Sequence, residues 1–149
     1  MTMKSKKLYL AIALLLATSL SACETNDTPI TFNELPTISQ QFIQRHFGDL
    51  DIALVVKDYD DLSFTYDVNF VNLYEVDFDK NGEWIKVDCQ RDSVPTAIVP
   101  AGIANYVATR FNGQYIVEIE RNTRSYDVEL NTGVDVVFDK DGKFKRIDD

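Results

Sequence analysis

The chain has 149 residues, of which 45% are hydrophobic and 11% aromatic, and this composition suits one packed domain and excludes a largely disordered protein. Its formal net charge is −9, and because residues 1–22 contain three lysines and no acid, the remainder has 12 basic and 24 acidic side chains. Such a surface argues against nucleic acid as a partner and favours basic partners or divalent cations, while solubility is its simplest role.

The N-terminus has the pattern of an export signal. Three lysines, Lys4, Lys6 and Lys7, precede the apolar run Leu8–Leu20. The run is too short to be a comfortable membrane span, and the combination predicts a signal peptide over residues 1–22 that is removed from the mature protein.

The end of this signal, Leu20-Ser21-Ala22-Cys23, resembles the bacterial lipobox, in which a peptidase cleaves before the cysteine and the cysteine carries the lipid. We therefore expect Cys23 to be lipidated and to anchor the protein to a membrane, since acyl chains supply about 0.8 kcal/mol per buried methylene. An ordinary secretory signal that contains a cysteine is the alternative. By the same resemblance, Glu24 in place of an aspartate favours the bacterial outer membrane, with the domain facing the periplasm or the cell exterior.

Residues 24–33 are polar and show no periodicity. With Cys23 they predict a flexible tether over residues 23–33, which holds the domain away from the bilayer.

A helix is predicted from Leu35-Pro36 onward, because proline is tolerated in a first helical turn and apolar residues then follow at near-helical spacing. Gly48 stops the pattern. The apolar residues are Ile38, Phe42, Ile43 and Phe47.

From Ile52 the hydrophobic period changes from that of a helix to that of a strand. Apolar residues alternate with polar ones across Leu62–Phe70 and again across Tyr74–Phe78. Together with Ile52–Lys57 and Trp84–Val87, these segments predict four antiparallel strands joined by tight turns.

The same arrangement recurs in the second half of the chain. Tyr66-Asp67-Val68 and Phe78-Asp79-Lys80-Asn81-Gly82 reappear 60 positions later as Tyr126-Asp127-Val128 and Phe138-Asp139-Lys140-Asp141-Gly142. Leu35-Pro36 matches Val99-Pro100 at an offset of 64, so the first copy has four extra residues between Gly48 and Asp61. The second copy predicts a helix to Phe111 and four strands, over residues 115–120, 124–130, 134–138 and 143–147.

We therefore predict an α+β fold over residues 34–149, a tandem duplication of a helix plus four antiparallel strands. The repeats span about 35–89 and 99–149, and Gln90–Ala97 is the crossover. Each copy is too small to bury a secure core alone. The expected result is one eight-stranded antiparallel sheet with two helices on one face.

These features together resemble the PepSY-like, β-lactamase-inhibitor-like lipoproteins of Bacteroidetes-type bacteria. The resemblance rests on the lipobox, the two helices that start at Leu/Val-Pro, and the doubled Tyr-Asp-Val and Phe-Asp-Lys-Asx-Gly motifs, and it covers Leu35 to the C-terminus. It implies a fold like that of the β-lactamase inhibitor protein, a curved sheet able to cup a partner, and no catalytic chemistry. No inhibitory contact residue can be matched to a position in this chain, so the resemblance does not imply inhibition.

The sequence offers little conventional catalytic chemistry. His46 is the one histidine, and we interpret it as a surface or packed helix residue. We expect Cys89 to be a buried, inert thiol, with intermolecular pairing as the alternative. No Cys-x-x-Cys, histidine cluster or glycine-rich phosphate loop occurs in the sequence, and we expect no cofactor.

One segment has the spacing of a calcium loop. Its oxygen ligands would be Asp77, Asp79, Asn81 and Asp88, with Gly82 at the turn. Strands rather than helices flank this segment, and the second copy has Val137 at the first ligand position. A hairpin turn explains both copies, so these residues are weak metal candidates only.

Two functional hypotheses follow from these features. The first is a lipid-anchored, non-catalytic envelope module that binds a protein or peptide through its sheet face or an insertion loop. Inhibition of an envelope enzyme is one form that this function could take. The loop residues are Lys57, Asp58, Tyr59, Asp60 and Asp61. The alternative is weak calcium binding, or a carboxylate-dependent envelope hydrolase that uses Asp77 and Asp79, although strand carboxylates on a solvated face have little to raise a pKa. A structural or sensory domain is a third possibility.

Overall fold

The computed structural model describes residues 27–60 and 62–148. The predicted signal peptide, Cys23 and Asp61 lie outside the described residues, as does the first part of the predicted tether. Among the residues described, no helix is long and apolar enough to cross a membrane.

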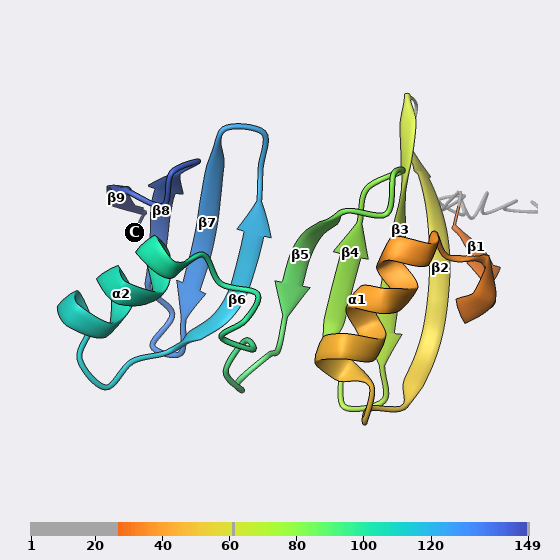
Figure 1. The fold of residues 1–149 in the computed structure, drawn as a ribbon, viewed down its shortest axis with the longest axis horizontal. Coiled ribbons are helices and arrows are strands. Elements are labelled where there is room, and N and C mark those ends of the chain that lie inside the picture. The colour runs from red at the N-terminus through yellow and green to blue at the C-terminus, as the bar shows by residue number, and fades with distance from the viewer. Residues whose placement is uncertain (1–26, 61, 149) are drawn as a thin grey trace, which may run out of the picture.

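The strands form one antiparallel sheet in which every strand pairs with its neighbours in the sequence (Figure 1). The sheet has nine strands, so the predicted number of eight was wrong. The strands are β1 (Thr28–Ile30), β2 (Ile52–Asp60), β3 (Ser63–Phe70), β4 (Glu75–Phe78), β5 (Trp84–Asp88), β6 (Ile116–Arg121), β7 (Ser125–Leu130), β8 (Asp135–Asp139) and β9 (Phe144–Asp148).

The additional strand comes from the segment that was predicted to be a flexible tether. β1 pairs with Val55–Lys57 at the edge of β2, where it satisfies backbone groups that would otherwise be open. Pro29 is tolerated because β1 is an edge strand. A short 3-10 helix, Phe32–Glu34, follows, and the Glu34 carboxylate accepts a hydrogen bond from the backbone N–H of Thr31 at 2.7 Å. The tether prediction is therefore wrong from Thr28 onward.

Two helices, α1 (Thr37–Phe47) and α2 (Ala101–Arg110), lie in front of the sheet in Figure 1. Each begins directly after a proline, as the sequence predicts. Phe42 of α1 meets Phe78 edge to face at 5.6 Å between ring centroids, and Tyr106 of α2 meets Phe138 in the same way at 5.4 Å. One hydrophobic core, shared by both halves of the chain, therefore lies between the helices and one face of the sheet.

The doubled Asp-Lys-Asx-Gly segments are hairpin turns, as predicted. In the first, Asp79 Oδ1 accepts hydrogen bonds from the backbone N–H groups of Asn81 and Glu83, each at 2.9 Å. Asp139 does the same for the backbone of its own turn, again at 2.9 Å. The aspartate side chain thus organises the turn in both halves.

The four extra residues of the first half lengthen one hairpin. Val55 pairs with Val68, while Ile119, 64 positions after Val55, pairs with Val128, 60 positions after Val68. The additional residues therefore lie between Val55 and Val68, in the outer part of the β2–β3 hairpin. Lys57–Asp60 belong to β2 and pair with β3, so the prediction of a loop there was wrong. Because the extra residues continue the ladder, the hairpin projects beyond the sheet (Figure 1).

Candidate functional site

The side chains of each strand alternate between the core and the opposite face of the sheet, which we call the open face. Val68, Val76 and Val87 are fully buried on the helix side, so their neighbours Asp67, Asp77 and Lys86 lie on the open face. The acidic residues that this alternation places there include Asp58, Asp67, Glu75, Asp77, Asp88, Glu118, Glu120, Asp127, Glu129, Asp135 and Asp148.

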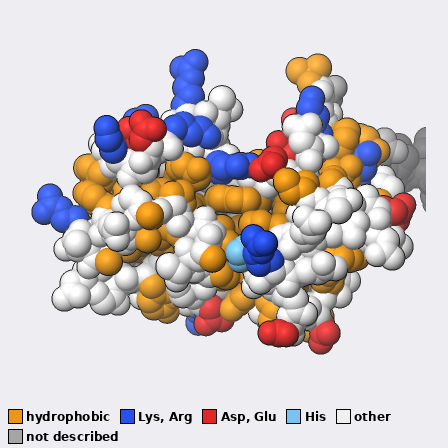
Figure 2. Space-filling model, in the orientation of Figure 1, with side chains coloured by type: hydrophobic (Ala, Val, Ile, Leu, Met, Phe, Trp, Pro, Cys, Tyr) orange, Lys and Arg blue, Asp and Glu red, His pale blue; other side chains and the backbone are white. Residues whose placement is uncertain are grey.

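Few cations balance these carboxylates. In the described part of the chain, the basic side chains of the open face are Lys86 and Arg146. The helix side differs in character: Figure 2 shows hydrophobic side chains between the two helices, with lysines and arginines among them. The net negative charge of the chain is therefore concentrated on one face of the sheet.

Asp77 is the most perturbed carboxyl of the open face. Burial, followed by the charges of Glu75 and Asp67, raises its pKa to about 8, although Lys86 acts in the opposite direction. Its Oδ1 atom is buried and has no hydrogen-bond partner among the described residues. The expectation that Asp77 would be well solvated was wrong, because strands on both sides of β4 crowd it with other acidic groups.

Lys86 lies at the centre of this acidic surface. Burial acts to lower its pKa, but Glu118, Glu75, Asp77 and their neighbours raise it overall. Its Nζ lies 3.5 Å from Glu118 Oε2. Burial is also the largest cause that raises the pKa of Glu118, which Lys86 counteracts. Lys86 therefore balances only part of the negative charge of the carboxylates around it.

A shallow depression of about 260 Å³ continues the open face across β6–β9. Asp127 lies in it, with Oδ2 accepting a hydrogen bond from Asn122 at 2.6 Å while Oδ1 is buried without a partner among the described residues. The charged groups that line the depression are carboxylates, whose oxygens can bind ammonium, guanidinium or a hard metal cation. The depression is lined by Glu118, Glu120, Asp127, Val128, Glu129, Asp135, Val136, Val137 and Asp148.

The candidate calcium ligands lie in different parts of the structure and do not converge on one point. Asp79 and Asn81 belong to a hairpin turn, in which the Asp79 carboxylate already accepts two backbone hydrogen bonds. Asp88 lies opposite Glu75, and its Oδ1 accepts a hydrogen bond from the backbone of Gln90 at 2.6 Å. No group of three or more acidic, histidine or cysteine side chains within residues 27–60 and 62–148 is placed to hold one metal ion.

Asp77 and Asp79, the two candidate catalytic carboxylates, also lie in different environments. Asp77 lies on the open face with a raised pKa, whereas the carboxylate of Asp79 organises the backbone of a turn. A carboxylate pair for acid–base catalysis needs two groups that both reach one substrate. The second member of the predicted pair is instead engaged by its own turn.

The candidate partner-binding residues that the structure describes, Lys57–Asp60, lie along the projecting β2–β3 hairpin. The Lys57 ammonium lies over the ring of Phe64, 3.9 Å from its centroid, and within 5.7 Å of those of Tyr59 and Tyr66. Such cation–π contacts stiffen the hairpin and engage the lysine. At the tip, Leu62 is 99% exposed.

His46 and Cys89 are placed as the sequence predicts. His46 packs against Phe42 with 4.7 Å between ring centroids, and burial, followed by the charge of Arg45, lowers its pKa. Cys89 is fully buried and free, and burial raises the pKa of its thiol to about 12. A thiol with so high a pKa is a poor nucleophile.

The fold and this site define a class: an α+β protein whose single antiparallel sheet is covered by two helices on one side and is open and acidic on the other. The family described as "Putative beta-lactamase-inhibitor-like, PepSY-like" matches residues 64–146. The chain belongs to this family, which confirms the resemblance inferred from the sequence.

Solved structures agree with this assignment. A "putative calcium-regulated periplasmic protein" from Bacteroides thetaiotaomicron is 40% identical with a TM-score of 0.81, and the match covers 83% of this chain and 98% of that one. A "putative periplasmic protein from DUF2874 family" of Bacteroides vulgatus is 38% identical, with a TM-score of 0.80 and the same coverage. A "putative periplasmic protein of unknown function" from the same organism is 33% identical with a TM-score of 0.79, covering 83% of this chain and 99% of that one. No protein of curated function matches the chain.

Proposed function

We propose that this protein is a lipid-anchored, non-catalytic binding module of the bacterial cell envelope, which binds a basic protein or peptide segment on its open acidic face. The observation that carries the proposal is the crowding of carboxylates on adjacent strands there, where Asp67 lies opposite Asp77 and Glu75 opposite Asp88. A cationic partner would relieve this repulsion, and the binding would gain from it. Inhibition of an envelope enzyme is one activity that such binding would produce.

The anchor is the second part of the proposal. Cys23 follows the lipobox-like Leu20-Ser21-Ala22, and the similar Bacteroides structures are described as periplasmic proteins. We propose lipidation at Cys23 and attachment to the outer membrane. Mass spectrometry of the N-terminal peptide should show acyl chains on Cys23, and Cys23→Ser should move the protein to the soluble fraction. An unmodified Cys23 in membrane-extracted protein would contradict the anchor.

Binding to the open face can be tested with a lysine-rich peptide that contains only lysine, serine and glycine. We expect measurable affinity at low salt that falls steeply as salt is added, because the attraction is electrostatic. Glu120→Gln with Glu129→Gln should weaken binding about tenfold, since both side chains line the acidic depression.

The matched control removes the same charge elsewhere. Asp49→Asn with Asp141→Asn neutralises two exposed carboxylates that lie outside the open face. We expect this variant to bind the peptide within about twofold of the wild type. Equal losses in the two double variants would show that net charge, rather than the open face, governs binding.

Calcium binding is a second candidate function. Two observations favour it: the oxygen-only donors of the depression with the unpartnered Asp127 Oδ1, and the relative described as calcium-regulated. Several side chains would have to converge on the ion, so we expect a dissociation constant of about 0.1–1 mM. Calorimetry should show binding that is lost in Glu120→Gln with Glu129→Gln. Loss in Asp79→Ala instead would locate the ion at the β4–β5 turn.

We also infer that the two halves arose by duplication of one helix and four strands. The inference is supported by the repeated motifs at an offset of 60 and by the equivalent aspartate-organised turns at Asp79 and Asp139. Separate expression of residues 90–149 tests whether one unit retains the capacity to fold. We expect it to be unfolded alone, because β5 and β6 share the central part of one core.

A further inference from the structure

Four hairpin turns of this sheet share one backbone design. In each, the residue at the third turn position donates its N–H to the carbonyl oxygen three residues earlier and has a left-handed backbone conformation. This is the three-residue hairpin turn that normally places glycine at that position. The residues are Leu73 (φ 73°), Gly82 (φ 87°), Gly133 (φ 78°) and Gly142 (φ 75°).

Leu73 is the exception among these four. A left-handed conformation is unfavourable for a residue with a Cβ atom, and a leucine gains nothing from the turn that glycine would not give. The equivalent turn of the second half has Gly133 at this position and Asn131 where the first half has Val71.

Packing within the chain does not explain the leucine. Its side chain is 73% exposed, and that of Val71 is 64% exposed. The β3–β4 turn thus presents two apolar side chains to solvent and accepts backbone strain to do so. Residues with such strain and exposure are characteristic of contact sites for other molecules.

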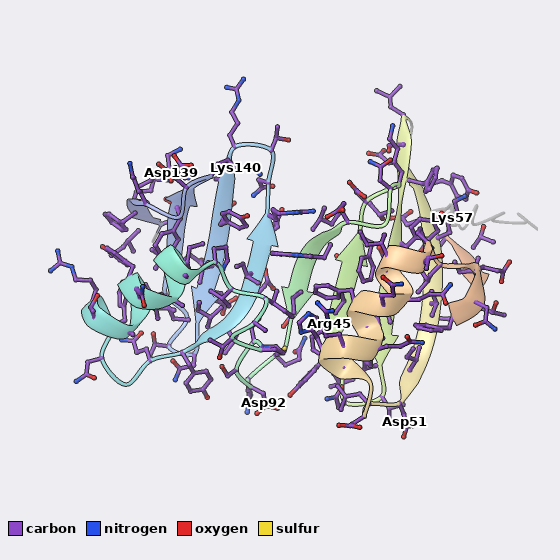
Figure 3. All side chains as sticks on the ribbon, viewed as in Figure 1. Arg45, Asp51, Lys57, Asp92, Asp139 and Lys140 are labelled. Carbon is purple, nitrogen blue, oxygen red and sulfur yellow. The ribbon has the colours of Figure 1, made fainter. Side chains whose placement is uncertain are left out.

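Acidic residues border this turn. The backbone N–H of Val71 donates to the carbonyl oxygen of Asp51 at 2.9 Å, and Tyr74, directly after the turn, donates its hydroxyl to Asp92 at 2.6 Å. Figure 3 shows Asp51 and Asp92 at the same end of the molecule. Glu75 then leads onto the open face. A partner that covers Val71 and Leu73 therefore meets negative charge around its apolar contact.

We propose that the turn Val71–Leu73 is a docking surface for a cationic amphipathic segment of a partner protein. The apolar side chains of the segment pack on Val71 and Leu73, while its lysines or arginines lie against Asp51, Asp92 and Glu75. This inference rests on the proposed function, and it defines the partner further: the partner presents apolar residues among its basic ones.

Two synthetic peptides with equal numbers of lysines test the inference. One contains two copies of Lys-Leu-Ala-Lys-Leu-Ala-Lys, and in the other serine and glycine replace leucine and alanine. We expect the wild type to bind the apolar-bearing peptide about tenfold more tightly. Leu73→Gly should abolish this preference and leave the affinity for the polar peptide unchanged.

Stability supplies an independent measurement. Because Leu73→Gly relieves the left-handed strain and removes only exposed apolar surface, its midpoint of thermal unfolding should rise by roughly 2–6 °C. A more stable variant with a weaker preference for the apolar-bearing peptide cannot be explained by unfolding. A lower midpoint would show that Leu73 supports the fold, and it would overturn the inference.

Leu62→Ser is the matched control, because Leu62 is also exposed but lies at the tip of the β2–β3 hairpin. It should keep the preference. If the polar peptide binds and Leu73→Gly changes nothing, the docking surface is wrong and the proposed function stands. If only the apolar-bearing peptide binds, in a way that depends on Leu73, the docking surface stands and binding to the acidic face by charge alone is wrong.

Discussion

Asp67 and Asp77 lie directly opposite one another on β3 and β4, and burial is the largest cause that raises the pKa of both carboxyls. The charge of Asp67 also raises the pKa of Asp77, because like charges on adjacent strands disfavour ionisation. The pair marks a part of the open face where acidic side chains of adjacent strands crowd one another. Its protonation should therefore be visible in the stability of the protein.

Asp77→Asn should change the pH dependence of stability. The pKa of Asp77 rises from 3.8 to about 8 on folding, so between these values the folded state binds more protons than the unfolded state. The contribution of this carboxyl to the free energy of unfolding is fully present below pH 3.8 and is lost as the pH rises toward 8. Denaturant titrations should find Asp77→Asn more stable than the wild type by about 2 kcal/mol at pH 8, with little difference at pH 4.

The control for this prediction is Asp135→Asn, which removes an exposed carboxylate from the same face. It should alter stability by less than about 0.5 kcal/mol at either pH. If Asp77→Asn were no more stable than the wild type at pH 8, the crowding argument for the open face would fail.

Gly82→Ala and Gly133→Ala separate two reasons for glycine in a turn. Both positions have a left-handed backbone, but a Cβ at Gly82 would lie 2.6 Å from Pro36 Cβ and Ile38 Cγ2, whereas a Cβ at Gly133 has no heavy atom within 4 Å. Gly133→Ala should therefore cost only the backbone strain, about 1 kcal/mol. Gly82→Ala adds a steric clash with the start of α1 and should cost about 3–5 kcal/mol. Equal losses by chemical denaturation would contradict this placement of α1.

Lys57→Ala should loosen the projecting β2–β3 hairpin without unfolding the domain. The ammonium bridges Tyr59, Phe64 and Tyr66, and its removal leaves the outer strand pairs without that support. Hydrogen exchange should become faster for the backbone of residues 57–60 and 63–66, while the global unfolding midpoint changes little. Lys140→Ala, which removes a 5.5 Å contact over Tyr126, should leave exchange in this hairpin unaltered.

Cys89 should resist thiol reagents in the folded protein. Its side chain is fully buried, and its thiol has a pKa of about 12. In a soluble form in which Cys23→Ser leaves Cys89 as the one thiol, labelling at pH 8 should be negligible in buffer and complete in denaturant. Rapid labelling of the folded form would show that this part of the core opens readily.

The residue pattern was sufficient for much of the fold. The alternation across Leu62–Phe70 predicted a strand with one buried face, and the prolines at 36 and 100 predicted where the helices begin. β1 was not predicted, because three residues are too few to show the alternation of apolar and polar side chains that indicates a strand. It forms only because the long β2 offers an open edge with which Thr28–Ile30 can pair.

The candidate site depended more strongly on the fold. The alternation within its own strand predicts a solvated Asp77, but burial between neighbouring strands, followed by the charges of Glu75 and Asp67, raises its pKa. Leu73 carries no unusual signal until its backbone is compared with those of Gly82, Gly133 and Gly142. The raised pKa of Asp77 and the unusual backbone of Leu73 are therefore visible only in the folded structure.

The helices, eight of the nine strands, the hairpin turns at Asp79 and Asp139, and the family could be predicted from the residue pattern, because these features depend on local periodicity and on short motifs. The folded structure was needed to show that the carboxylates gather on one face, that the four extra residues extend a hairpin, and that Leu73 has the left-handed backbone conformation typical of glycine. These depend on the register between strands and on which sheet face the helices cover, and neither is encoded in any single segment.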